Sequence, residues 1–206
     1  YNRGGNERKG RNMTYKMIVL MGGQGAGKGT HARRLIDEKG YKYVEAGAIL
    51  RGLPTTSPVA QIMARGELVP DEDLFKIIGD AIQKVGASDM IVDGFPRTIG
   101  QAQWLVKQYS AKYDIHVLYL NLPEEIMLQR IQNRIREGGG RADDANPETV
   151  RRRLDNFKKT TMPAVIWLQT APGIKFSDVD VSEFEFESNY AKVCNALKIT
   201  PKTATR

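Results

Sequence analysis

The chain has 206 residues, 41% of them hydrophobic, and a formal net charge of +7. This length suits one well-filled α/β core and is too short for two full domains. No apolar run approaches the roughly 20 residues of a membrane-spanning helix and nothing resembles a signal peptide, so we expect a globular cytoplasmic protein without a membrane partner. The single cysteine, Cys194, excludes an internal disulfide and a cysteine-built metal site.

The first twelve residues, YNRGGNERKGRN, are basic and lack hydrophobic periodicity. Four basic residues against one acidic residue account for +3 of the +7 and leave +4 for the rest. We interpret residues 1–12 as a disordered arm or an artificial leader, with the native chain starting at Met13, and residues 201–206 as a tail. An arm that contacts RNA is the alternative. We do not expect a nucleic-acid partner, because the aromatic residues form no base-stacking platform.

Between residues 13 and 200, short apolar runs alternate with amphipathic stretches, which is typical of a parallel sheet with helices on both faces. The strands are expected at 17–21, 41–44, 90–93, 116–122 and 173–179. The helices are expected at 28–39, 71–85, 99–109, 123–136, 147–169 with a break near Pro163, and 182–197. Ligands in such a sheet gather at the carboxyl ends of the strands, so the loops there should face one site.

The segment Lys16 to Thr30, KMIVLMGGQGAGKGT, joins the first apolar run to a glycine-rich loop that we interpret as a phosphate cradle. Glycines allow positive φ and inward-pointing N–H groups, and the helix that follows adds its positive dipole end. Lys28 adds a mobile positive charge. The spacing fits the phosphate-loop pattern, except that Gly29 follows the lysine and the hydroxyl comes at Thr30. An ordinary glycine turn is disfavoured by the flanking strand and helix. His31 is expected to be structural and partly exposed.

Two segments interrupt the alternation. The first, residues 46–69, carries Pro54 and Pro58 in place of a helical run, and the second, REGGGRADDANP, is polar and glycine-rich. We interpret both as mobile covers, since Gly138 to Gly140 permit the dihedral changes that a closing flap needs.

Charged side chains recur where the loops should converge. Asp93 ends the strand 90–93 and is expected to position Mg²⁺ through water, because Mg²⁺ keeps most of its water shell and takes only one or two carboxylates. A lone arginine is usually a solvated residue, but guanidinium groups bind phosphate bidentately, and six around one cradle predict a phosphate-binding set. They are Arg51, Arg97, Arg130, Arg134, Arg141 and Arg153.

Taken in order, five stretches resemble the motifs of nucleoside monophosphate kinases, most closely those of adenylate kinases. They are GGQGAGKGT at 22–30, AILR at 48–51, GELVPDE at 66–72, VDGFPRTIGQAQ at 92–103 and GRADDANPETVRRRL at 140–154. The resemblance implies a P-loop NTPase core with a five-stranded parallel sheet and helices on both faces. It also implies a monophosphate-binding insert at 46–72 and a short lid at 134–146 without zinc. The implied reaction is reversible, Mg²⁺-dependent transfer of the γ-phosphoryl group of ATP to AMP.

The resemblance further implies roles for single residues. The implied catalytic set is Lys28, Arg97, Arg134, Arg141 and Arg153. The implied ATP-binding set is Gly25, Ala26, Gly27, Lys28, Gly29, Thr30, Arg130 and Arg134. The implied AMP-binding set is Ala46, Arg51, Val69, Gly94, Arg97, Gln101, Arg141 and Arg153. Gln101, accompanied by Thr98, would read the adenine through its amide. Asp143 and Asp144 match lid-hinge acids, and a helix-capping pair before Pro147 is the alternative for them.

The chain departs from the family pattern near the acceptor. It has Gln24 where proline is usual and Ala48 where aspartate is usual. Ala46 is similar to the uridylate and cytidylate kinases, whereas Thr98 and Gln101 are similar to adenylate kinases. We give Gln101 more weight, because an amide makes a positive contact with a base edge. The stretch 179–184 lacks the glycine often found near the donor adenine, so the donor base is less specified than the donor phosphates.

Adenylate kinase is therefore the leading hypothesis, and a UMP or CMP kinase is the alternative within the class. Two further alternatives are a nucleotide-binding sensor without turnover and a P-loop kinase acting on a sugar or another small metabolite. The arginines that serve only the transition state disfavour the sensor. We expect a monomer, since the covers must swing freely.

Overall fold

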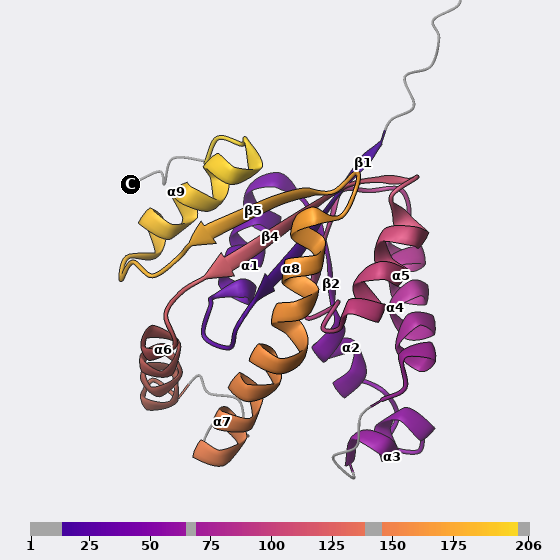
Figure 1. Ribbon diagram of the computed structural model, residues 1–206, viewed down its shortest axis with the longest axis horizontal. Helices are drawn as coiled ribbons and strands as arrows, with labels where there is room; N and C mark the ends of the chain where they lie inside the picture. The colour runs from indigo at the N-terminus through magenta and orange to yellow at the C-terminus, as the bar shows by residue number, and fades with distance from the viewer. Residues whose placement is uncertain (1–13, 65–68, 139–145, 202–206) are drawn as a thin grey trace, which may run out of the picture.

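The computed structural model describes residues 14–64, 69–138 and 146–201. Within them, a parallel sheet with the strand order β2-β3-β1-β4-β5 is flanked by helices (Figure 1). The strands are β1 (Tyr15–Gly22), β2 (Lys42–Glu45), β3 (Met90–Asp93), β4 (Tyr113–Asn121) and β5 (Lys175–Asp180). Because β1 pairs in parallel with both β3 and β4, the glycine loop leaves the sheet at its centre.

The helices divide between the two faces of the sheet. They are α1 (Lys28–Lys39), α2 (Ala46–Arg51), α3 (Pro58–Ala64), α4 (Asp71–Val85), α5 (Ile99–Tyr109), α6 (Glu124–Arg136), α7 (Pro147–Asn156), the π-helical η1 (Phe157–Thr161), α8 (Met162–Thr170) and α9 (Phe186–Leu197). Buried residues of α1, α6, α7 and α9 share one apolar cluster, and those of α4, α5 and α8 share another. None of the helices in the described ranges is long and apolar enough to cross a membrane.

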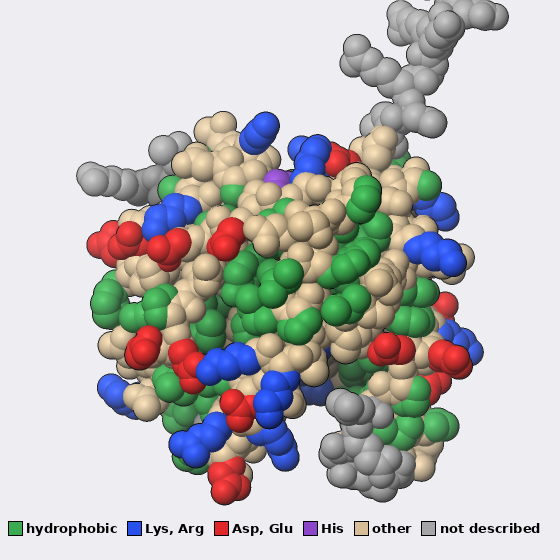
Figure 2. All heavy atoms as spheres, in the orientation of Figure 1, with side chains coloured by type: hydrophobic (Ala, Val, Ile, Leu, Met, Phe, Trp, Pro, Cys, Tyr) green, Lys and Arg blue, Asp and Glu red, His purple; other side chains and the backbone are tan. Residues whose placement is uncertain are grey.

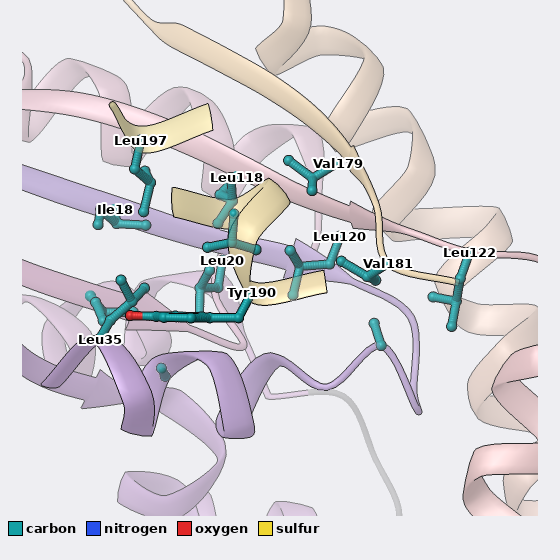
Figure 3. Close-up of a cluster of buried hydrophobic side chains, with 14 of the residues drawn as sticks. Ile18, Leu20, Leu35, Leu118, Leu120, Leu122, Val179, Val181, Tyr190 and Leu197 are labelled. Carbon is teal, nitrogen blue, oxygen red and sulfur yellow. The ribbon is translucent and has the colours of Figure 1, made fainter. Parts of the chain in front are cut away.

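The strands are apolar on both faces, as a covered parallel sheet requires. Successive side chains point to opposite faces, so Ile18 and Leu20 of β1 join the α1 and α9 cluster while Met17 and Val19 join the other. Figure 3 shows the first cluster, in which Tyr190 of α9 lies beside Leu20 and Leu35. The Tyr190 ring is buried, and its hydroxyl donates to Glu38 Oε2 at 3.1 Å.

The predicted alternation of strands and helices is confirmed. The helices 28–39, 71–85 and 99–109 have the predicted bounds, and the strand 90–93 does too. The absence of a helical run around Pro58 is a wrong prediction, because α3 begins at Pro58. Proline suits the first turn of a helix, where its missing N–H is not needed, and the Ser57 hydroxyl accepts from the Ala60 N–H at 3.2 Å.

The predicted break near Pro163 is also corrected. The chain stays helical from α7 through η1 into α8, but its hydrogen bonds change, and the Met162 N–H donates to the Phe157 carbonyl five residues earlier. Proline lacks an N–H and its ring crowds the preceding turn. A π-helical turn accommodates one extra residue there without ending the helix.

The central strand β4 supplies a stability prediction. Leu118 is fully buried in the α1 and α9 cluster, so Leu118→Ala should leave a cavity and lower the free energy of unfolding by about 2–5 kcal/mol. Urea titration followed by circular dichroism measures this. The control is Leu128→Ala on α6, where the side chain is 36% exposed, and it should cost less than about 1 kcal/mol. Equal losses in the two variants would contradict the burial described.

Candidate functional site

The glycine-rich loop connects β1 to α1 at the carboxyl edge of the sheet. Two of its glycines are required by close packing as well as by positive φ. A Cβ on Gly22 (φ 150°) would lie 2.8 Å from the Leu120 carbonyl oxygen, and one on Gly25 (φ 85°) would lie 2.8 Å from the Met127 carbonyl oxygen. The loop is therefore held against β4 and α6 by backbone contact. Gly27 ends it in the left-handed conformation, as the N-cap of α1.

Lys28 folds back over this loop. Its Nζ donates to the carbonyl oxygens of Gly22 at 2.8 Å and Gly23 at 3.1 Å. The ammonium group thus lies at the loop, beside the N-terminal end of α1, where the helix dipole is positive. Both features favour an anion at this point, as the sequence predicts for a phosphate cradle.

Asp93, the last residue of β3, lies next to the strand that carries the loop. It pairs in register with Leu20 of β1 and with Glu45 of β2. Its carboxylate is buried, and Oδ2 accepts from the Tyr43 hydroxyl at 2.9 Å. Tyr43 was not predicted as a site residue. Its position near the end of the short predicted strand YKYV, at the carboxyl edge of the sheet, could have indicated it as a site residue.

The donor set around Asp93 fits a Mg²⁺ ion held mainly by water and phosphate. Carboxylate oxygen is the ligand type that Mg²⁺ prefers, and one or two carboxylates suffice. No group of three or more His, Cys, Asp or Glu side chains in the described ranges is placed to hold a metal ion. A metal at Asp93 would therefore depend on the phosphate groups of a bound nucleotide for its remaining ligands.

The segment after β3 forms a second polar cluster. Arg97 Nε donates to the Gly94 carbonyl oxygen at 2.9 Å, which directs the guanidinium back toward β3. A Cβ on Gly94 would lie 3.8 Å from the Ala46 Cβ at the start of α2, so the two predicted acceptor stretches meet here. At the end of α2, Arg51 Nη2 bonds Glu45 Oε1 at 3.2 Å. Val69 lies partly buried before α4.

Gln101 is buried below this cluster and already holds protein partners. Its Oε1 accepts from the Arg97 N–H at 2.8 Å, and its Nε2 donates to Asp71 Oδ1 at 2.8 Å. An amide offers two donor hydrogens and two acceptor lone pairs, so one of each remains for a base. Thr98 has a structural role that was not predicted, because its hydroxyl caps α5 by accepting from the Gln101 N–H.

Arg130 on α6 contacts a different part of the chain. Its Nη2 donates to the carbonyl oxygens of Val181 at 2.6 Å and Glu183 at 2.8 Å. Burial lowers the pKa of this guanidinium below its ordinary value. Arg130 therefore fixes the loop between β5 and α9, the stretch that the resemblance places near the donor adenine.

Two of the remaining predicted arginines, Arg134 and Arg153, belong to the α6 and α7 end of the molecule, where basic side chains gather in Figure 2. Arg134 lies in the last turn of α6, and Arg153 lies in the last turn of α7. Arg141, Asp143 and Asp144 lie outside the described residues, as does most of the predicted lid. Asn146, in place of the two acids, caps α7 by accepting from the N–H groups of Glu148 and Thr149.

His31 corrects a prediction, because it is buried and not partly exposed. Its ring packs on Phe186 of α9 with a centroid distance of 4.9 Å. Its Nδ1 is buried without a hydrogen bond to any residue that the structure describes. Burial, and then the charge of Arg130, lower the pKa of His31 to about 4, so the ring is neutral at pH 7.

These contacts define a P-loop nucleotide-binding protein of the parallel α/β class. A glycine loop with its lysine, a buried carboxylate on the adjacent strand and a set of arginines share the carboxyl edge of one sheet. Such an arrangement is typical of proteins that bind polyphosphates and transfer phosphoryl groups.

Comparison with known proteins identifies the family. The sequence model of the family described as adenylate kinase matches residues 20–171. The adenylate kinase of Thermus thermophilus is 39% identical over 168 residues, which cover 78% of this chain and 87% of the relative. The adenylate kinase of Parvibaculum lavamentivorans is 37% identical over 184 residues, which cover 82% of this chain and 89% of the relative. Adenylate kinase isoenzyme 1 of Cyprinus carpio is 34% identical over 190 residues, which cover 89% of this chain and 96% of the relative. The chain belongs to the adenylate kinase family, which confirms the predicted resemblance.

The buried His31 predicts a pH-dependent stability. The folded-state pKa of about 4 lies below the unfolded value of 6.5, so the unfolded chain binds more protons between these values and stability falls as pH drops through this window. Between pH 7 and pH 5 this histidine should cost the fold about 2 kcal/mol. Urea titrations at both pH values, on the native chain and on His31→Phe, measure the difference. An equal loss in the variant would show that other groups cause it.

Proposed function

We propose that this chain is an adenylate kinase, which reversibly transfers the γ-phosphoryl group of ATP to AMP and forms two molecules of ADP. One observation carries the proposal. The loop that holds Lys28 and the segment that holds Arg97 and Gln101 leave adjacent parallel strands, β1 and β3, at the same edge of the sheet. A donor phosphate at the first and an acceptor phosphate at the second would lie next to each other.

The donor triphosphate would be bound by backbone N–H groups and by Lys28. In the structure the ammonium group is bonded to two loop carbonyls, which hold it near the place where phosphate oxygens would lie. A phosphate would replace these neutral acceptors with charged ones, which form stronger bonds with an ammonium group. The proposed contacts are Gly25, Ala26, Gly27, Lys28, Gly29, Thr30, Arg130 and Arg134.

Mg²⁺ bound with ATP would neutralise part of the phosphate charge. Asp93 is the proposed residue for holding it, acting through water. The Tyr43 hydroxyl, bonded to Oδ2 at 2.9 Å, orients the carboxylate and leaves Oδ1 to accept from such a water. We propose no zinc for this protein.

The acceptor AMP would bind on the α2 and α5 side. Arg51 and Arg97 would bind its phosphate, and Gln101 would contact the adenine with the donor and acceptor positions that Arg97 and Asp71 do not use. Ala46, Val69 and Gly94 would complete the proposed pocket, and Arg141 and Arg153 would contact the transferring group.

The chemistry needs no general base, because the acceptor phosphate oxygen is already anionic. The work of the protein is to align the two nucleotides and to neutralise the charge that spreads over the transferring group. The proposed covers, residues 46–72 and 134–146, would exclude water and so suppress hydrolysis of ATP. We further propose that the protein acts as a cytoplasmic monomer.

Loss of the Lys28 charge tests the donor site. Lys28→Met should lower kcat by at least about 100-fold, because the transferring phosphoryl group loses a cation that stabilises the transition state. A coupled assay of ADP formation measures this. Lys107→Met, on the exposed side of α5, is the matched control and should keep full activity. Near-normal turnover of Lys28→Met would overturn the proposed function.

The acceptor base is tested with AMP, UMP, CMP and GMP offered separately with ATP and Mg²⁺. We expect a preference for AMP, and Gln101→Leu should raise the KM for AMP by about 10–100-fold, since it removes a polar contact to the base and two internal bonds. Gln103→Leu, exposed on the same helix, is the control. A preference for UMP or CMP would indicate that Ala46 sets the base, and binding of ATP without turnover would indicate a sensor.

A further inference from the structure

A groove of about 760 Å³ lies away from the nucleotide site. It is formed where β1 and β4 begin and where α4 and α5 end, with Tyr15, Tyr113, Ile82 and Tyr109 in its lining. The glycine loop and Asp93 lie at the opposite, carboxyl edge of the same sheet. Figure 1 shows the start of β1 at the end of the molecule opposite to α2 and α3. The volume is in the range of small-molecule sites.

The floor of the groove is aromatic. The rings of Tyr15 and Tyr113 lie 6.4 Å apart, and those of Tyr109 and Tyr113 lie 6.1 Å apart. Phe75, also in the lining, stacks on Trp104 at 4.6 Å, and Trp104 meets Tyr109 edge to face at 5.7 Å. These contacts fix the rings in place. Tyr113 is buried, so the preformed surface that a planar ligand could contact comes from the partly buried rings of Tyr15, Phe75 and Tyr109.

A glycine in the middle of α4 lies in the lining of the groove. Gly79 lies within the 15-residue helix, where glycine is less favourable than alanine by about 1 kcal/mol. Its φ is not positive, and a Cβ there would meet the Tyr109 hydroxyl at 3.6 Å and Trp104 at 3.7 Å, which are ordinary contacts. The backbone conformation therefore does not require glycine, and a methyl group would fit. A larger side chain would crowd Trp104 and Tyr109, and Tyr109 is part of the groove lining.

The rim of the groove is polar and carries more positive than negative charge. Lys76 and Asp80 lie one turn apart on α4, Lys112 lies between α5 and β4, and all three charged side chains are exposed. The Tyr109 hydroxyl has no hydrogen bond to another residue of the described ranges and can orient a polar ligand group.

We propose that this groove is a second ligand site, which binds a small planar aromatic carboxylate. The ring would stack on the tyrosine and phenylalanine floor, and the carboxylate would bind Lys76 or Lys112 at the rim. The inference goes beyond the proposed kinase function, because the groove contains none of the nucleotide-binding residues.

The test uses 7-hydroxycoumarin-3-carboxylate as the probe and Trp104 as the reporter. The sequence has two tryptophans, so the substitution Trp167→Phe leaves Trp104 as the single tryptophan. With saturating ADP and Mg²⁺ present to occupy the kinase site, the probe should quench Trp104 emission saturably and gain anisotropy, with a dissociation constant below about 1 mM. Gly79→Leu should weaken binding at least 10-fold. Lys84→Leu, exposed on the same helix, should not change it.

Two further variants allow the proposal to be tested even if the Gly79→Leu chain does not fold. Gly79→Ala should fold with an equal or higher melting temperature and bind the probe several-fold more weakly. Lys112→Glu reverses the rim charge without touching the floor and should also weaken binding several-fold. Activity of all variants with ATP and AMP should stay at the native level, which separates this proposal from the kinase assignment.

Three results would overturn the proposal. The first is the absence of saturable quenching, and the second is equal binding by the native and both Gly79 variants. The third concerns the first twelve residues, which precede the groove residues Thr14 and Tyr15 in the chain. If their removal strengthened probe binding 10-fold or more, that segment would be the occupant, and not a small molecule.

Discussion

The parallel pairing of β1 with β3 and β4 is the constraint on which the site depends. The register sets Leu20 opposite Asp93 and Gly22 opposite Leu120, so the glycine loop, the carboxylate and the loop after β4 emerge together. Backbone contact then fixes the loop, because Gly25 leaves no room for a side chain beside Met127. The glycine-rich loop is thus positioned by hydrogen bonds and close packing of the main chain, to which its own side chains contribute little.

Around this fixed centre, the site residues are held by partners that a ligand could replace or extend. Lys28 is bonded to carbonyl oxygens, Arg51 to a glutamate and Gln101 to Asp71. The bond matters most for the buried Gln101, whose amide would otherwise be costly to leave unpaired, whereas the Arg51 side chain is exposed. A ligand must therefore compete with these internal contacts, which favours charged ligands over neutral ones.

The sequence predicts the architecture well, because strands and helices depend on local patterns. Apolar runs located all five strands, and helix bounds such as 71–85 followed from periodicity. Contacts between distant segments could not be predicted in this way. The bond from Tyr43 to Asp93 and the burial of His31 beneath Phe186 depend on how β2 and α9 pack. Pro163 was misread because proline chemistry excludes a hydrogen bond but does not say whether the chain breaks or widens its turn.

The π-helical turn before Pro163 also sets the angular relation between the two halves of a long helix. Val150 and Leu154 of α7 join the cluster on the α1 and α9 face, whereas Val165 and Leu168 of α8 join the opposite one. One extra residue in the turn rotates the first apolar stripe by roughly 100° relative to the second. The continuous helix can thereby pack against both layers of the domain. The π-helical hydrogen bonding of residues 157–161 therefore also sets the direction in which α7 presents Arg153.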